Sequence, residues 1–333
     1  MKKLAYSLLP LGITVGLCLN IAPASAGLVV QNVISNAALS IDGFGSLSNN
    51  GVIQANIPTG SIIQRAYLYA ASVWNNPVNG VTFHGNALSV GSATILGPDE
   101  NPATTARWDV TSIITSSFTG GLQDFSILEN GQNDGAVLVV AYSNPSTQGF
   151  TSVILDGELS TKGDTVQFDF VSPYTGGDFL VSLASSYSRQ PSEQFTQIDV
   201  TTNSTNNRRL TTSAGGQDDG EGDDGALITV GGIGDDPTNP GPLDSPFGGP
   251  RIDDEYYNLA LGNSANSAPF ISAGDKYLRL KTANPSNDDN VFGMFITSGF
   301  KITVTPVPEP SMTLGIFGIG AIGILLSRLG KKS

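Results

Sequence analysis

The chain has 333 residues with 29 acidic and 16 basic side chains, and its net charge at pH 7 is −13. Residues 27–305 lie between two terminal segments of different composition and hold 28 of the acidic and 11 of the basic side chains, a net charge of about −17. This balance argues against nucleic acid as a partner, because binding to phosphates depends on clustered cations.

The first 26 residues have the composition of a secretory signal peptide. Two lysines open the chain, an apolar stretch covers residues 4–21, and Ala24 and Ala26 supply small side chains at the cleavage positions. We expect cleavage after Ala26, which makes Gly27 the first mature residue. The alternative is an uncleaved N-terminal anchor.

Two residue types that often build catalytic or metal sites are scarce. The single cysteine, Cys18, lies inside the predicted signal peptide, so the mature chain has no thiol and no disulfide. The single histidine, His84, is followed by Gly85 and is expected to be an exposed turn residue. Zinc is therefore not expected, because its sites are built mainly from cysteine and histidine.

Short runs of β-branched and aromatic residues, separated by Gly, Pro, Asn and Asp, predict strands throughout the body. The expected strands are 29–34, 38–41, 51–57, 62–74, 81–83, 87–90, 136–142, 151–155, 165–171, 179–186, 195–202, 226–230, 256–261, 276–281 and a closing pair within 291–304. This pattern predicts a mainly β fold, an antiparallel β-sandwich or jelly-roll-like body. We favour one integrated domain at 27–305 with an acidic insertion at about 213–255, although a seam near 188–207 is the alternative.

Three local patterns in the body are specific. The continuous apolar run AVLVVAY at 136–142 predicts a strand buried on both faces. Asp109 is expected to be the N-cap of one or two helical turns. Asp156 and Glu158 flank a glycine and predict a turn, although two carboxylates could also serve a secreted glycan hydrolase.

Three pieces of the body, at residues 65–70, 108–111 and 134–142, resemble stretches of uncharacterised bacterial surface β-sandwich domains. The resemblance implies a fold and no particular function.

Residues 215–255 carry eleven acidic side chains against a single Arg251 on a Gly- and Pro-rich backbone. Many oxygens on a flexible chain suit a hard cation such as Ca²⁺. Residues 231–236 (GGIGDD) also fit the start of a nonapeptide calcium-binding repeat, but only once. The alternative is a solvated acidic loop. The first candidates for Ca²⁺ ligands are Asp219, Glu221, Asp223 and Asp224.

Aromatic residues near the acidic segment are candidates for stacking on a sugar ring. Tyr256 and Tyr257 follow it directly, and Trp74 and Trp108 lie earlier in the chain. Rings of this kind present apolar faces with polar tips. The alternative is that these side chains belong to the core.

The C-terminal segment, residues 306–333, has three parts in a fixed order. A Pro-Glu-Pro triplet comes first and is expected to be extended, because proline fixes φ and donates no N–H. A transmembrane helix is expected at about 311–327, since only a helix satisfies its own backbone polar groups in lipid. A basic tail at 328–333 should stay on the cytoplasmic side. The residues are Pro308, Glu309 and Pro310 in the triplet and Arg328, Lys331 and Lys332 in the tail.

This tripartite segment resembles the PEP-CTERM sorting domain of Gram-negative envelope proteins. The resemblance implies that an exosortase, a membrane-embedded transpeptidase, recognises Pro308, Glu309 and Pro310 and processes the chain. It also implies export through the inner membrane to the cell envelope, the cell surface or the extracellular matrix. A simple C-terminal membrane anchor is the alternative.

For the body we expect a structural or adhesive role without catalysis. The second interpretation is a Ca²⁺-assisted polysaccharide-binding module that uses the acidic segment and Tyr256. The third is a secreted glycan hydrolase.

Overall fold

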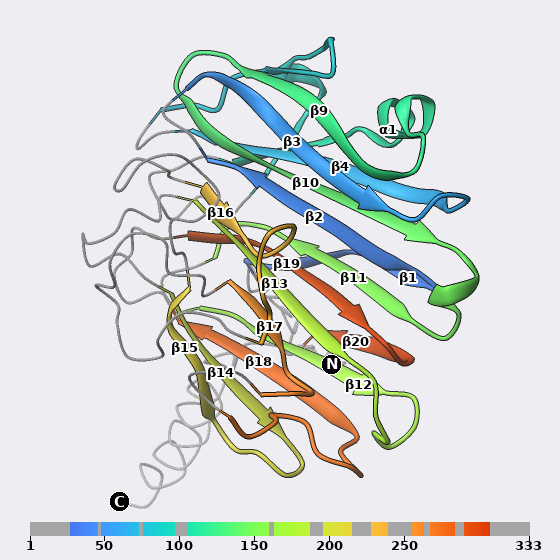
Figure 1. The fold of residues 1–333 in the computed structure, drawn as a ribbon. Coiled ribbons are helices and arrows are strands. Elements are labelled where there is room, and N and C mark those ends of the chain that lie inside the picture. Colours follow the sequence, from blue (N-terminus) through green and yellow to red (C-terminus); the bar gives the residue numbers. More distant parts are fainter. Residues whose placement is uncertain are drawn as a thin grey trace, which may run out of the picture. The chain divides into compact units, whose positions relative to one another are not determined.

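A computed structural model describes residues 27–45, 48–72, 76–96, 105–159, 163–186, 196–214, 228–238, 255–262, 267–283 and 290–306. These residues form mostly strands, with one short α-helix and two 3-10 turns (Figure 1). In chain order the elements are β1 (Val29–Ser35), β2 (Ala38–Phe44), β3 (Asn50–Ile57), β4 (Ile62–Ser72), β5 (Val81–Phe83), β6 (Asn86–Leu88), η1 (Val90–Ser92), β7 (Thr94–Ile95), β8 (Thr105–Asp109), α1 (Thr111–Ser117), β9 (Gly121–Glu129), β10 (Asn133–Ser143), η2 (Pro145–Thr147), β11 (Thr151–Asp156), β12 (Thr165–Phe170), β13 (Phe179–Ser186), β14 (Thr196–Thr202), β15 (Arg208–Ala214), β16 (Ile228–Val230), β17 (Tyr256–Asn258), β18 (Tyr277–Ala283), β19 (Asn290–Ser298) and β20 (Ile302–Pro306).

The strands pair antiparallel in four sheets, which we number I to IV. Sheet I has the order β3-β9-β5-β6, and sheet II has the order β2-β10-β4-β8-β7. Sheet III has the order β1-β11-β19-β13-β16, with β17 also paired to β13, and sheet IV has the order β15-β14-β18-β12-β20. Sheets I and II therefore come from residues 38–143, whereas sheets III and IV come from β1 and the later strands.

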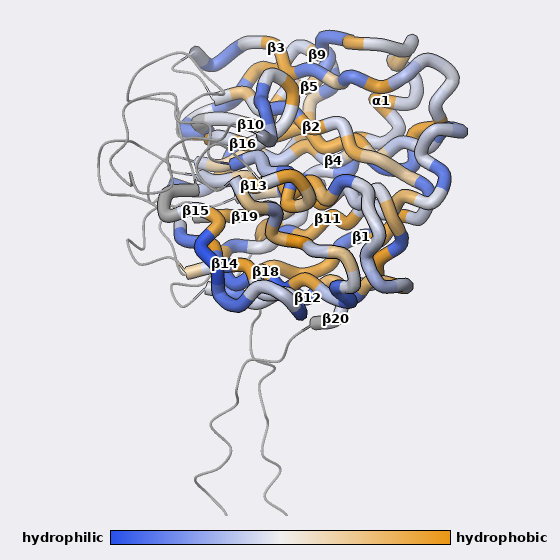
Figure 2. Tube along the Cα trace, turned by 60° about the horizontal axis from the view of Figure 1, so that its bottom comes forward, coloured by the Kyte–Doolittle hydropathy of each residue, from blue (hydrophilic) through white to orange (hydrophobic). Residues whose placement is uncertain are grey.

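The four sheets stack in the order I, II, III, IV, with an apolar core between each neighbouring pair. One core joins sheets I and II through residues such as Ile53 and Leu138. A second joins sheets II and III through Val139 and Phe295, and a third joins sheets III and IV through Val181 and Leu278. Apolar segments concentrate in the packed strands (Figure 2). The body is two β-sandwiches packed back to back, which confirms the predicted mainly β, antiparallel sandwich fold.

Strand β10 shows why the two central sheets are buried on both faces. Successive side chains of a strand point to opposite faces. Ala136, Leu138 and Val140 accordingly enter the core between sheets I and II, while Val137 and Val139 enter the core between sheets II and III. All five side chains are fully buried. The prediction of a doubly buried strand at 136–142 is confirmed.

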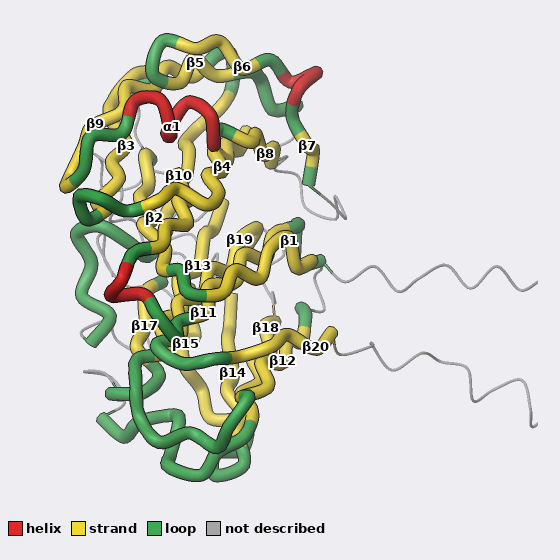
Figure 3. The backbone as a smooth tube through the Cα atoms, turned by 90° about the vertical axis from the view of Figure 1, so that its right-hand side faces the viewer, coloured by secondary structure: helices red, strands yellow, loops and turns green. Residues whose placement is uncertain are grey.

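Helix α1 lies beside β4 (Figure 3). Its buried residue Ile114 belongs to the core between sheets I and II. The expected helix is present, but its cap lies one residue later than predicted. Val110 is the N-cap residue, and the carboxylate of Asp109 accepts a hydrogen bond from the backbone N–H of Thr111 at 3.0 Å. Asp109 therefore stabilises the turn that enters the helix.

Some expected boundaries differ from those observed. Strands β7, β8, β9 and β15 were not predicted, because β7 and β8 are short, β9 carries apolar residues on its exposed face, and β15 is mostly polar. No seam falls at 196–207, since β14 pairs with both β15 and β18 inside sheet IV. His84 is an exposed residue of the β5–β6 turn with φ 47°, as predicted.

Candidate functional site

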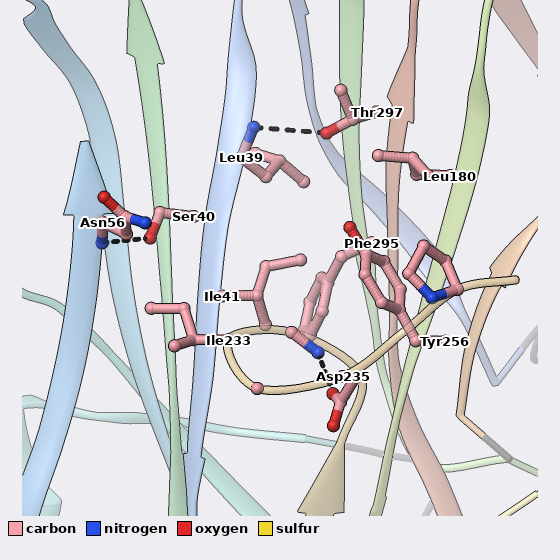
Figure 4. A pocket seen from close by; sticks show the side chains of 13 residues that line it. Leu39, Ser40, Ile41, Asn56, Leu180, Ile233, Asp235, Tyr256, Phe295 and Thr297 are labelled. Atoms are coloured by element: carbon pink, nitrogen blue, oxygen red, sulfur yellow. Dashed lines mark hydrogen bonds between the residues drawn. The ribbon is translucent and has the colours of Figure 1, made fainter. Parts of the chain in front are cut away.

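A pocket of about 360 Å³ lies between β2 of sheet II and the strands β13, β17 and β19 of sheet III. The loop at residues 232–237, which follows β16, closes one side of it. Figure 4 shows the side chains of Ile41, Phe295 and Tyr256 side by side across this gap. We call it the β2 pocket. Its polar lining groups come from Ser40, Asn56, Asp235, Tyr256 and Thr297.

The β2 pocket exists because β2 is an edge strand. Within sheet II it pairs only with β10. On its other edge the N–H of Leu39 donates to the hydroxyl of Thr297 at 3.2 Å, and the carbonyl of Ile41 accepts from the N–H of Ile233 at 2.9 Å. These backbone groups are thus satisfied by a side chain and a loop instead of a neighbouring strand. This protects the edge of the sheet from pairing with another chain and leaves space for the pocket beside β2.

The side chain of Asp235 stabilises the loop that follows β16. The Asp235 side chain accepts from the N–H of Gly232 at 2.5 Å, and the Asp235 N–H donates to the Gly232 carbonyl at 3.3 Å. A Cβ at Gly232 would collide with the backbone carbonyl of Ile41, so this close approach needs glycine. Residues 231–236 therefore form a closed turn against β2.

Tyr256 and Tyr257 point to opposite faces of β17. Tyr256 is partly exposed and lines the β2 pocket. Burial, followed by the nearby carboxylates of Asp235 and Asp178, raises the pKa of Tyr256 to about 12. Its phenol is therefore protonated at physiological pH and can both donate and accept hydrogen bonds.

Tyr257 is 1% exposed and packs in the core between sheets III and IV. Its ring has no face open to a ligand, so the suggestion that it belongs to a ligand surface is wrong. Trp108 is likewise 2% exposed, and its indole N–H donates to the carbonyl of Ser89 at 2.9 Å. Trp74 lies outside the described residues.

The chemistry of the β2 pocket suits a neutral polar molecule or a cation. Phe295 and Ile41 supply an apolar floor, while the phenol of Tyr256 and the amide side chain of Asn56 supply hydrogen-bonding groups. The carboxylate of Asp235 disfavours an anion. A mixed pocket of a few hundred cubic ångströms is the usual size for a small-molecule or single-sugar site.

The two carboxylates considered for a hydrolase are structural. Asp156 is 1% exposed, binds Arg107 at 2.5 Å and accepts a hydrogen bond from the hydroxyl of Tyr69 at 2.8 Å. Glu158 is fully buried and accepts a hydrogen bond from the backbone N–H of Thr105 at 2.8 Å. The chain bends at Gly157 directly after β11, as expected, but both carboxylates are buried and a sugar cannot reach either group.

Several predicted sites lie outside the described residues. These are the signal-peptide positions Ala24 and Ala26, the calcium candidates Asp219, Glu221, Asp223 and Asp224, the triplet Pro308, Glu309 and Pro310, and the basic residues Arg328, Lys331 and Lys332. Across the described ranges, no group of three or more His, Cys, Asp or Glu side chains is placed to hold a metal ion. In the same ranges no helix has the length and apolar character needed to cross a membrane.

Comparison with known families identifies the C-terminal segment. Residues 306–331 match the PEP-CTERM protein-sorting motif. This confirms the resemblance found in the sequence and indicates an exported protein that an exosortase sorts.

Comparison with whole proteins adds nothing about the body. No curated protein matches the chain significantly. The major capsid protein P2 of bacteriophage PM2 aligns with 80% of this chain and 98% of its own at 11% identity, with a TM-score of 0.23. The C-terminal domain of the AgI/II polypeptide BspA of Streptococcus agalactiae aligns with 81% and 96% at 7% identity, with a TM-score of 0.12. At these TM-scores neither likeness bears on the body.

Proposed function

We propose that the mature protein is a structural or adhesive component of the cell envelope or extracellular matrix and that it carries out no catalysis. The sorting motif at 306–331 is the observation that supports this most directly, because it delivers the chain to the cell surface. The three packed cores support it further, since a body built this way suits a long-lived scaffold outside the cell. Its partners would be the export machinery, the inner membrane and an exosortase.

Glu309→Ala tests the sorting step. We expect the variant to be exported but to retain its C-terminal segment, because the charged residue of the Pro-Glu-Pro triplet is lost. Immunoblotting and intact mass of the envelope fraction would show a longer product than the wild-type chain gives. Ser311→Ala, directly after the triplet, serves as the control and should be processed normally. Normal processing of Glu309→Ala would contradict exosortase recognition of this triplet.

A second candidate function is the binding of a neutral polysaccharide, assisted by Ca²⁺ in the acidic segment. The β2 pocket favours it, because it places the partly exposed Tyr256 and the side chain of Asn56 around a space of single-sugar size. The acidic lining and the net negative charge of the body both disfavour a polyanion.

Retention of the exported protein on the neutral polysaccharide of its own matrix tests this candidate. Tyr256→Ala should weaken binding by about tenfold, equivalent to about 1.4 kcal/mol, because a stacking face and a hydrogen-bonding group are removed together. Tyr277→Ala, a partly exposed tyrosine of sheet IV outside the pocket, is the matched control. Loss of retention with a chelator and in Asp223→Ala would add the calcium requirement. Equal retention of Tyr256→Ala and Tyr277→Ala would exclude the β2 pocket.

A further inference from the structure

The first residues after the expected signal-peptide cleavage site bind a buried carboxylate. The side chain of Asp164, which precedes β12, accepts a hydrogen bond from the backbone nitrogen of Gly27 at 3.0 Å. Its other oxygen accepts from the backbone nitrogen of Leu28 at 3.1 Å. Both bonds are buried, and they join segments 136 or 137 residues apart in the sequence. The start of the body is therefore fixed inside the fold.

The space around Gly27 admits only glycine. A Cβ there would lie 2.5 Å from the carbonyl oxygen of Glu158 and 2.5 Å from a carboxylate oxygen of Asp164. The next residue, Leu28, is 4% exposed and belongs to the core between sheets III and IV. Residues 27 and 28 are thus core residues, although they directly follow a segment that is expected to be removed.

Two hydrogen bonds to Thr282 of β18 fix the backbone of Asp164. Its backbone N–H donates to the hydroxyl of Thr282 on β18 at 2.7 Å, and its carbonyl accepts from the N–H of Thr282 at 2.8 Å. Asp164 is 5% exposed. A carboxylate this deeply buried is costly unless charged or hydrogen-bonding groups surround it. The nitrogen of Gly27 occupies one of these positions.

We propose that Asp164 is the binding site for the α-ammonium group that signal-peptide removal creates at Gly27. The inference rests on the proposed export. A signal peptidase adds water across the Ala26–Gly27 peptide bond, Ala26 keeps the new carboxylate, and the amine of Gly27 takes up a proton near neutral pH. Processing thereby converts a hydrogen bond from a neutral amide into a buried ion pair, and the processed body is more stable than its precursor.

The first test uses the full exported protein purified from its cells. N-terminal sequencing should begin at Gly27. Under native conditions an amine-acylating reagent should modify Gly27 at least about tenfold more slowly than the exposed side chains of Lys276, Lys281 and Lys301, because buried groups react only after opening. A different N-terminus would overturn the inference together with the predicted cleavage site. A Gly27 terminus that reacts as fast as the lysines would overturn the inference alone and leave export intact.

The second test measures how much the ion pair between Asp164 and the Gly27 amine contributes to stability, separately from the burial of Asp164. In the processed chain Asp164→Asn should expose Gly27 to the reagent and lower Tm by about 5–10 °C, as expected for one member of a buried ion pair. Asp169→Asn, a neighbouring acid on β12, is the matched control. In a chain kept unprocessed by Ala26→Leu, Asp164→Asn should lower Tm by less than half as much. Equal losses with and without processing would contradict the ion pair.

Discussion

Asp42 shows how one buried carboxyl group can set the pH response of the fold. It lies on β2 with 9% of its surface exposed, and it accepts a hydrogen bond from the backbone N–H of Gln54. Burial raises the pKa of Asp42 from 3.8 to about 7, although hydrogen bonds from the backbone of Gln54 and Gly43 oppose the change. The folded chain therefore binds more protons than the unfolded chain between about pH 4 and pH 7.

Because the folded chain binds the extra proton, the contribution of Asp42 to stability is greatest at low pH. The contribution of Asp42 to the free energy of unfolding decreases as pH rises from about 4 to about 7, and Asp42 causes no further change above that range. Asp42→Asn keeps an acceptor oxygen but removes the titration. The variant should lose up to about 4 kcal/mol of this pH dependence, from about 1.4 kcal/mol per pKa unit.

Urea unfolding of wild type and Asp42→Asn at pH 4.5, 6 and 8 measures the slope directly. Ser40→Ala is the control and should keep the wild-type slope, because Ser40 also accepts a hydrogen bond on β2 from a backbone N–H of β3 but has no ionisable group. An unchanged slope in Asp42→Asn would show that Asp42 is not the titrating group.

At the scale of elements, a buried ion pair joins the two sandwiches. Arg107 of β8 in sheet II binds Asp156 of β11 in sheet III at 2.5 Å, and Tyr69 of β4 donates to the same carboxylate. The guanidinium also lies 4.9 Å from the ring centroid of Tyr67. Burial raises the pKa of Asp156, and the charge of Arg107 opposes that increase. Removal of either partner would leave the other charge buried and unpaired.

Arg107→Met should destabilise the fold by about 3–5 kcal/mol, because it leaves a buried carboxylate without its cation. The matched control is Arg65→Met. Arg65 pairs with Asp109 at 2.9 Å between β4 and β8, but both side chains are exposed, by 39% and 50%. Its loss should cost less than about 1 kcal/mol. Chemical denaturation compares the two variants, and equal losses would contradict a structural role for the buried pair.

The elements also show what local sequence can and cannot predict. The apolar run of β10 was recognised, because burial on both faces leaves a continuous pattern in one segment. Strand β9 was missed, because the exposed Leu122 and Leu128 and the buried Glu129 obscure the alternation of apolar and polar residues that marks a half-buried strand.

The β2 pocket could be predicted only in part. Tyr256 was found because it follows the acidic segment, and Asp235 lies within that segment. Thr297 and Leu39, in contrast, are 258 residues apart and meet only through the packing of sheets II and III. No local pattern encodes such a contact. The same holds for Asp164, whose partner at Gly27 lies 137 residues earlier.

At the scale of the whole molecule, both ends of the described body converge on β12. Asp164, directly before this strand, binds Gly27, while Val166 within it pairs with Pro306 at the end of β20. The body therefore begins and ends on neighbouring strands of sheets III and IV. The segment that matches the sorting motif starts at residue 306, where β20 ends. The core residues between the sheets all lie between these two points of the chain.

The intact mass of the native protein, measured in each fraction of its own cells, tests the central claim most directly. The account predicts a mature chain in the envelope or matrix fraction that has lost residues 1–26 and the segment beyond the triplet at 308–310. Such a product would establish an exported exosortase substrate. A chain that still carries residues 312–333 and stays in the membrane fraction would contradict this account and identify the protein as a tail-anchored surface domain.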